Sequence, residues 1–476
     1  MKTGLKNRWV KAKSIRPKCS AIDMIKVNPA LPEPIRRSLS LSWKEGIASE
    51  VTVWIMDYYL TAYGLFLGAG PKQIGWLVAV PLFFASFSQF FVTWLVRRIG
   101  SRRRFLFRVG LTQVAVLFPA AFLVLLPIEN RVSILIGLIM VFRVGQSLTD
   151  TVWFSLMSEY LPAHERPGYF GARSRITGSA GVASLVLGGL VLYALPEAIR
   201  AYGFFLLFFI TAAARLISIF MLARMTDIPL EHRPEHHFTF WMFIRQFRKS
   251  NFVKYVFFSA AMMFSVQLAG PYFSVYLLRD LKVNYMTFMV IHFSSVIVRL
   301  ISIPRWGRHA DQVGNASILK LVTFLFPAIP LLWIFSSHLG YILILQMFAG
   351  FLWAGYALCS TNFIYDSVSS GKRVRCLGYW TLICGMGNAA GAFLGGFLAE
   401  HLPPLMGYSI LMLFLVSTVV RLGLYFLLAP RFKEVRQNIK TVSGLELLLS
   451  MLKIRPILAE KGWVGRGEAA HIGDEF

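Results

Sequence analysis

Four charged side chains interrupt long apolar stretches of this sequence, in two pairs with the same spacing. Glu50 and Asp57 lie in one stretch, and Arg143 and Asp150 lie in another. Seven residues are nearly two turns of an α-helix, so each helix would present its pair on one face. A charge at the centre of a bilayer costs at least about 2.5 kcal/mol, so few are expected there without a reason.

The directions of the two helices decide which of these charges meet. If the first helix runs outward and the second inward, Asp57 and Arg143 lie at one depth near the middle of the membrane. Glu50 and Asp150 then lie about 10 Å closer to the cytoplasm. Arg143 would neutralise Asp57 and leave the lower carboxylates able to hold a proton. A purely structural ion pair is the alternative interpretation.

The composition indicates what surrounds these charges. Of the 476 residues, 56% are hydrophobic and only 15% are charged, and the mean hydropathy is +0.60. Soluble domains carry about 25% charged residues, so this chain is too apolar for an ordinary soluble enzyme. A membrane-spanning helix needs about 20 apolar residues. We predict twelve such helices, at residues 45–68, 73–96, 105–126, 132–158, 174–195, 201–224, 252–278, 283–304, 317–336, 340–367, 376–400 and 406–429.

The formal net charge of +26 would suggest a nucleic-acid partner in a soluble protein. Here the basic residues cluster in the loops after every second predicted helix, as they do in loops held in the cytoplasm. We therefore expect no nucleic-acid partner and cytoplasmic N- and C-termini, in the bacterial cytoplasmic (inner) membrane. The chain has no G-x-x-x-x-G-K-[ST] loop and no C-x-x-C pair, so we expect no cofactor and no metal.

The two halves of the chain repeat each other. Residues 178–196 align without gaps on residues 385–403, an offset of 207. The same offset pairs Glu159 with Asp366 and Arg166 with Arg373. Two six-helix units in parallel orientation explain this register.

The repeat sets the expected domain organisation. The chain divides into a basic cytoplasmic N-terminal tail (1–44), an N-terminal six-helix bundle (45–224), a central cytoplasmic loop (225–251), a C-terminal six-helix bundle (252–430) and a cytoplasmic C-terminal tail (431–476). Two further apolar stretches, 238–249 and 445–452, are too short to span and suit helices in the membrane interface.

A spaced glycine and acid motif stands in one loop of the second half. Residues 307–315 read GRHADQVGN, with Gly307, Asp311 and Gly314 at its key positions. The small residue lets two helix ends approach, the acid can face a helix N-terminus or a basic neighbour, and the second glycine permits the turn. The motif resembles the G-x-x-x-D-[RK]-x-G-[RK] signature of the major facilitator superfamily.

Other segments extend this resemblance to nearly the whole chain. The corresponding first-half loop keeps Gly100 but has Thr93 and Arg97 at the positions of the first glycine and the acid. Residues 159–168, EYLPAHERPG, are similar to the family's E-x-x-P-x-x-x-R-G pattern. Residues 143–147, RVGQS, are similar to its R-x-x-Q-G motif, which is associated with proton coupling. The resemblance implies two bundles that open to each side of the membrane in turn.

The resemblance also nominates residues for the site, because helices 1, 4, 7 and 10 of this family line a central cavity. Besides the four charged residues, the candidates for the substrate cavity are Gln146, Gln267, Tyr272, Asn362 and Tyr365. The candidates for gating are Gly307, Asp311, Gly314, Glu159, Arg166, Asp366 and Arg373, with Arg373 as an example of a basic partner for Asp311. His292 is a weaker candidate for carrying a proton. Arg215 and Arg421 are expected to snorkel or to pair within the protein.

The function expected from these features is secondary active transport by alternating access, not enzymatic catalysis. The expected partners are a small solute, a proton and membrane lipid, and the expected state is a monomer. We favour uptake of a polar or anionic metabolite, because Arg143 can attract an anion and the fifth helix has only part of the drug/proton antiporter signature. Export of amphipathic compounds is one alternative, and a non-transporting receptor or assembly scaffold is another.

Overall fold

All regular structure in the described residues is helical, apart from one isolated bridge between Leu405 and Tyr408. The computed structural model describes residues 31–162, 165–228, 244–245, 250–368, 373–436, 439, 446–447 and 450. The first half contains α1 (Glu33–Phe66), α2 (Pro71–Ser88), α3 (Val92–Ile99), α4 (Arg102–Phe122), α5 (Arg131–Tyr160), α6 (Arg166–Ala194), η2 (Glu197–Ile199) and α7 (Arg200–Ala223). The second half contains α9 (Asn251–Val275), η4 (Tyr276–Asp280), α10 (Tyr285–Val313), α11 (Asn315–Leu325), α12 (Ala328–Leu332), α13 (Leu339–Ser367), α14 (Arg373–His401), α15 (Ser409–Leu428) and η5 (Ala429–Arg431).

These helices account for the predicted membrane spans. Within the described residues, ten helices are long and apolar enough to cross a membrane, and the pair α2 and α3, bent by 61°, is an eleventh. We count α1 as the twelfth because it packs against α6 and α7 despite its acidic residues. It begins at Glu33, directly after Pro32, well before the predicted start at residue 45. The all-α polytopic architecture is confirmed, whereas the two predicted interface helices lie mostly outside the described residues.

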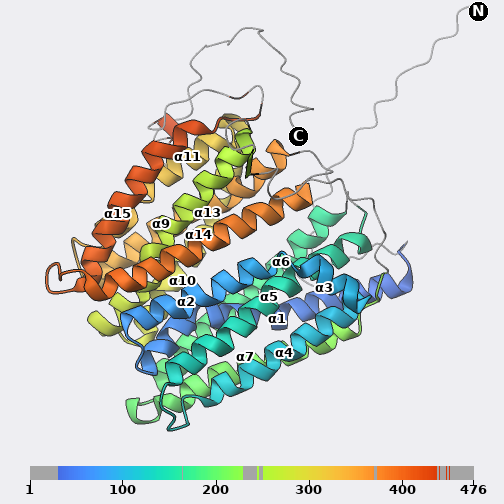
Figure 1. Cartoon of the computed structure of the whole chain (residues 1–476), viewed down its shortest axis with the longest axis horizontal. Helices are drawn as coiled ribbons and strands as arrows, with labels where there is room; N and C mark the ends of the chain where they lie inside the picture. Colours follow the sequence, from blue (N-terminus) through green and yellow to red (C-terminus); the bar gives the residue numbers. More distant parts are fainter. Residues whose placement is uncertain are drawn as a thin grey trace, which may run out of the picture.

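The spans form two bundles, α1–α7 and α9–α15, which lie beside each other in Figure 1. Their most extensive contacts are those of α2 with α14 and of α6 with α10. The aligned segments 178–196 and 385–403 fall in α6 and α14, so these are equivalent helices of the two bundles. Each bundle therefore contributes its second and fifth spans to the contact, as an approximate twofold repeat requires.

Glycines permit the closest helix contacts. Gly387, Gly391 and Gly395 of α14 recur every four residues, and a Cβ on each would lie 2.1–2.6 Å from a backbone oxygen of α9. A Cβ on Gly75 of α2 would lie 2.6 Å from the Cα of Gly396 in α14. The stripe of small residues therefore has the packing role that is usual between membrane helices.

Several contacts between the bundles lie at the end where α2 begins and α14 finishes. The Tyr272 hydroxyl donates a hydrogen bond of 3.2 Å to the Pro71 carbonyl oxygen. The Lys72 ammonium lies 3.6 Å from the Glu400 carboxylate. The loop charges predict that this end faces the outside of the membrane.

Candidate functional site

Asp57 of α1 and Arg143 of α5 form an ion pair. Nη2 of Arg143 lies 2.6 Å from Oδ1 of Asp57, and its Nη1 donates to Oε1 of Gln146 at 2.9 Å. The Asp57 side chain is 47% exposed and that of Arg143 is 21% exposed. The predicted meeting of Asp57 and Arg143 at one depth in the membrane is therefore seen in the structure. The Asp57 carboxylate nevertheless stays about half accessible to solvent.

The two acids predicted nearer the cytoplasm have different surroundings. The Trp54 indole donates a hydrogen bond of 2.9 Å to the Glu50 carboxylate, from one turn further along α1. Asp150 is exposed, and no described residue donates a hydrogen bond to it. Neither carboxylate forms an ion pair with another described residue, so either can accept a proton without breaking one.

A buried charge network on the first bundle escaped the sequence analysis. Glu45 of α1 is 3% exposed, lies 3.1 Å from Nη2 of Arg173 and accepts a hydrogen bond of 3.0 Å from Ser218. Arg215 of α7 donates to Ser218 at 3.3 Å and to Gln113 at 2.9 and 2.6 Å. The prediction that Arg215 pairs internally agrees with these contacts. An arginine inside an apolar helix needs polar partners within the protein, and this need was the signal available in the sequence.

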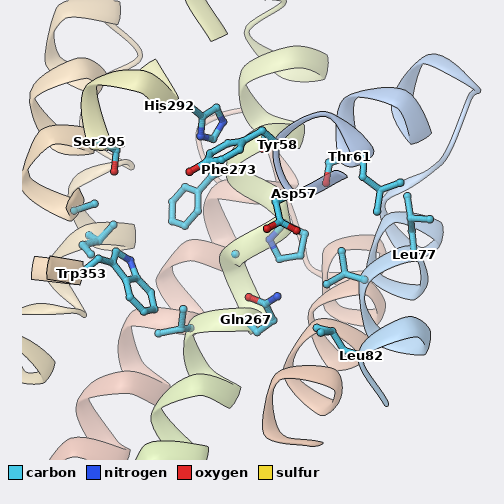
Figure 2. Close-up of a pocket in the computed structure, with 18 of the residues that line it drawn as sticks. Asp57, Tyr58, Thr61, Leu77, Leu82, Gln267, Phe273, His292, Ser295 and Trp353 are labelled. Carbon is cyan, nitrogen blue, oxygen red and sulfur yellow. The ribbon is translucent and has the colours of Figure 1, made fainter. Parts of the chain in front are cut away.

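A cavity of about 480 Å³ lies between the bundles. The first bundle contributes Asp57 and Arg143 to its lining, and the second contributes Gln267 of α9, Gln346 of α13 and Arg421 of α15. Its aromatic lining residues are Tyr58, Phe273, Phe326 and Trp353. Figure 2 shows side chains from both bundles around this space. A few polar groups in a largely apolar wall, at this volume, are typical of a small-molecule site.

The structure brings only part of the predicted substrate set into this cavity. Gln267 lines it, and Gln146 lies one hydrogen bond away through Arg143. Tyr272 is instead buried in the contact between the bundles. Asn362 and Tyr365 do not line it, because they lie nine and twelve residues beyond Trp353 on α13, roughly 14–18 Å further along the axis.

The second-half gating residues meet in a charge cluster at the other end of the bundle. Arg436 lies 2.7 Å from the Asp366 carboxylate and 3.4 Å from that of Asp311. Asn315 also donates to Asp366 at 2.7 Å. Partial burial lowers the pKa of Arg436, but the hydrogen bonds and charges of the two carboxylates outweigh this and raise it. Arg436 was missed because it follows the last span, in the predicted tail.

The glycines of the motif have separate roles beside this cluster. Gly314 has φ +83°, a conformation that side chains rarely adopt, and it ends α10. Glu434 then caps the next helix, accepting a hydrogen bond of 2.7 Å from the Ala316 amide. Gly307 lies inside α10 and faces Leu358 of α13. The side chain of Arg373, the suggested partner of Asp311, lies outside the described residues.

The first half builds a similar cluster from different residues, although its motif is degenerate. Arg102 of α4 donates to both oxygens of Glu159, one of them at 2.8 Å. Asp227 caps α4 by accepting hydrogen bonds from the Ser101 hydroxyl and the Arg103 amide. Asp227 and Glu434 are related by the offset of 207, so an acid after the last helix caps the third span in each half.

Two further predicted residues have local contacts. Nε of Arg166 donates a hydrogen bond of 3.0 Å to the Leu161 carbonyl oxygen. His292 of α10 packs edge-on against Tyr58 and Phe288, with ring centroids 5.5 and 4.5 Å away. Its buried Nε2 has no hydrogen-bond partner among the described residues.

Two pseudo-symmetric six-helix bundles around a central cavity define the fold of a membrane transporter of the alternating-access type. The Major Facilitator Superfamily model matches residues 19–326 and 255–465. The chain belongs to this superfamily.

Solved structures show the same fold at low sequence identity. The nucleoside transporter NupG aligns with a TM-score of 0.64 and 13% identity over 83% of this chain and 99% of its own. A D-xylose-proton symporter aligns with a TM-score of 0.60 and 12% identity over 88% of this chain and 100% of its own. The human organic anion transporter MFSD10 aligns with a TM-score of 0.52 and 13% identity over 83% of this chain and 100% of its own.

One curated relative is similar over a shorter stretch. The class B tetracycline resistance protein of Escherichia coli is 27% identical over 167 residues, 34% of this chain. The match spans only 40% of that relative's length.

Proposed function

We propose that this protein is a proton-coupled secondary transporter that moves a small polar or anionic solute by alternating access. The observation that supports this proposal best is the position of the Asp57 and Arg143 ion pair in the wall of the cavity between the bundles. A charge pair in a central cavity can change its state on binding a proton or a solute. A structural pair buried within one bundle has no such access.

The proposed coupling uses the ion pair as the proton-sensitive element. A proton on Asp57 removes the negative charge that holds Arg143, so the guanidinium becomes free to attract an anionic solute. Glu50 and Asp150 supply further carboxylates on the same two helices, on the predicted path to the cytoplasm. Proton binding would then favour one cavity orientation over the other, because the two orientations differ in how they hold this charge.

The test is solute uptake into proteoliposomes with and without an imposed pH gradient, preceded by a thermal-shift panel of solutes on the purified protein. Gradient-driven accumulation is expected for the wild type. Asp57→Asn should abolish accumulation while keeping exchange of solute without a gradient. Accumulation at the wild-type level in Asp57→Asn would contradict the proposed coupling residue. Absence of uptake and exchange for every solute that binds would contradict transport itself.

Export of amphipathic compounds is the second candidate. The aromatic cavity wall suits an amphipathic solute, and the partial match to a tetracycline resistance protein adds support. Inverted membrane vesicles separate the two directions, because an exporter accumulates its solute in them and an importer does not. The expected result is accumulation in right-side-out vesicles only.

A further inference from the structure

The second bundle carries a buried arginine at the cavity whose charge no acid balances. Arg421 of α15 is 2% exposed and lines the cavity. Its Nε, Nη1 and Nη2 donate to the backbone oxygens of Ser265, Phe326 and Val266 at 3.4, 2.9 and 3.3 Å. Among the described residues, no carboxylate forms an ion pair with it. Burial of an unpaired cation is costly, so such a residue in a membrane span is retained for a function.

The internal repeat shows that this imbalance is specific to the second bundle. Arg215 is the counterpart of Arg421, since each stands on the sixth span at an offset of 206. In both bundles a hydroxyl contact between the first and sixth spans lies one turn away: Thr52 donates to Thr211, and Ser417 donates to Ser265. The two arginines therefore occupy equivalent places.

The acids around these equivalent arginines differ. Glu45 and Asp150 are the carboxylates whose charges act on Arg215. An offset of 213 relates the first spans, and 207 relates the fourth spans, so their counterparts are Phe258 and Ala357. The second bundle has kept the arginine and has no acid at either place. The charge of Arg215 is balanced by carboxylates of its own bundle, whereas the charge of Arg421 needs a negative charge from outside the second bundle.

We infer that Arg421 is the anchor of an anion subsite, and that the solute is an amphipathic organic monoanion whose carboxylate or similar group binds there. The inference rests on the proposed transport function and names its substrate class. Arginine has five N–H donors, and three have backbone acceptors, which leaves one on each terminal nitrogen. Two donors in one plane match the two oxygens of a carboxylate.

The rest of the cavity fits such a solute. Its charged lining residues are Asp57, Arg143 and Arg421, a net formal charge of +1 that one anionic group neutralises. The side-chain amides of Gln267 and Gln346 line the same space and have no hydrogen-bond partner among the described residues, so they can donate to the solute.

An aromatic surface lies directly beside the proposed anchor. Phe326, whose carbonyl accepts from Arg421, packs its ring 5.0 Å from that of Trp353. An apolar body attached to the anion would therefore lie against Trp353. This combination of a charged anchor with an aromatic wall favours an aromatic anion over a sugar.

A second cation lies on α10, the helix that contributes His292 and Ser295 to the cavity lining. Arg299 of α10 is exposed and has no ion-pair partner in the described part of the chain. It lies one turn beyond the cavity residue Ser295 and two turns beyond His292, and so on the same helix face. Its charge acts on Tyr58 of the opposite bundle. Arg299 can therefore attract an anion toward the cavity before Arg421 holds it.

The test uses two probes of the same shape, 2-naphthoate and neutral 2-naphthamide, titrated calorimetrically into the purified full-length protein. Naphthoate should bind at least about tenfold more tightly than naphthamide. Arg421→Gln should lower naphthoate affinity by about tenfold or more and leave naphthamide affinity unchanged, while Arg421→Lys should lower it less. Equal affinity of the wild type for both probes would overturn the inference.

A second variant keeps the test informative where Arg421→Gln does not fold. Gln346→Glu adds a negative charge to the cavity without removing any bond of Arg421, and Gln346→Met is its neutral control. The glutamate should weaken naphthoate binding about tenfold or more, and the methionine should not. Unchanged naphthoate affinity in the glutamate variant would also overturn the inference.

The failure of this inference is distinguishable from failure of the transport proposal. These titrations need no membrane and no gradient. Anion binding without uptake in proteoliposomes would count against transport alone. Uptake of a neutral solute, with no preference for naphthoate, would count against the anion subsite alone.

Discussion

Loss of the Arg143 charge alone should lower the free energy of unfolding by about 1–2 kcal/mol. Two unit charges 4 Å apart attract by about 4 kcal/mol at an effective dielectric constant near 20. The 2.6 Å contact is closer, but solvent reaches 47% of the Asp57 side chain, so water replaces much of the lost interaction. Removing one partner of a fully buried pair would cost about 3–5 kcal/mol, more than this geometry allows.

The measurement is a double-mutant cycle on protein in detergent micelles. Arg143→Gln, Asp57→Asn and the double variant are compared with the wild type by denaturant titration. We expect a coupling energy of about 1–2 kcal/mol, so the double variant should be more stable than the two separate losses imply. The control pair is Lys72 and Glu400, which is 3.6 Å apart and 41% and 48% exposed. Its coupling should stay below about 0.5 kcal/mol.

Two results would refute this reasoning. Additive losses would show that the ion pair makes no net contribution and that its role in coupling needs another basis. A coupling energy above about 3 kcal/mol would show that the pair is as shielded as a buried one, against the exposure of Asp57. Gradient-driven uptake in the same variants then separates the stability of the pair from its function.

Three further outcomes are expected. Arg436→Gln should slow transport without weakening solute binding, because it opens a cluster remote from the cavity. The raised pKa of Arg436 stabilises the fold at every pH below the ordinary arginine range. The difference in melting temperature between this variant and the wild type should therefore be equal at about pH 6 and about pH 9. Single cysteines at exposed Arg104 and Ser337, in a background without the native cysteines, should react with an impermeant reagent from opposite sides, and reaction from one side would contradict the twelve-span topology. Gly75→Ala should lower the melting temperature and increase the labelling of a single cysteine introduced into the contact between α2 and α14. The reason is that its Cβ would lie 2.6 Å from the Cα of Gly396. Unchanged labelling would show that the contact accommodates the methyl group.

The spans and the central ion pair were predictable because their signals are local. An apolar run of about 20 residues indicates a membrane helix without any tertiary information. The match between Asp57 and Arg143 needed only two helix directions and the rise per residue. The ion pair between Glu45 and Arg173 was not predictable in this way, because Glu45 is the first residue of its predicted span and Arg173 lies just before the start of another.

Other misses came from contacts that no spacing encodes. Tyr272 lies on a helix that lines the cavity, but its hydroxyl reaches Pro71 of the opposite bundle. That contact depends on how the two bundles pack against each other, and the packing cannot be derived from the positions of residues on one helix. Arg436 was not expected as a partner of Asp311, because it reaches the motif only when the chain turns back after α15.

The comparison of the two halves suggests a division of labour between proton and solute. Arg215 and Arg421 hold equivalent positions, yet among the described residues only the first bundle places acids near its arginine. Proton binding can therefore change charge mainly in the first bundle, where Asp57, Glu50 and Asp150 stand. The proposed anion site belongs to the second bundle. Coupling must then cross the cavity between them, so a variant that removes the proton-binding carboxylate of the first bundle should uncouple proton from solute while the second bundle still binds the solute.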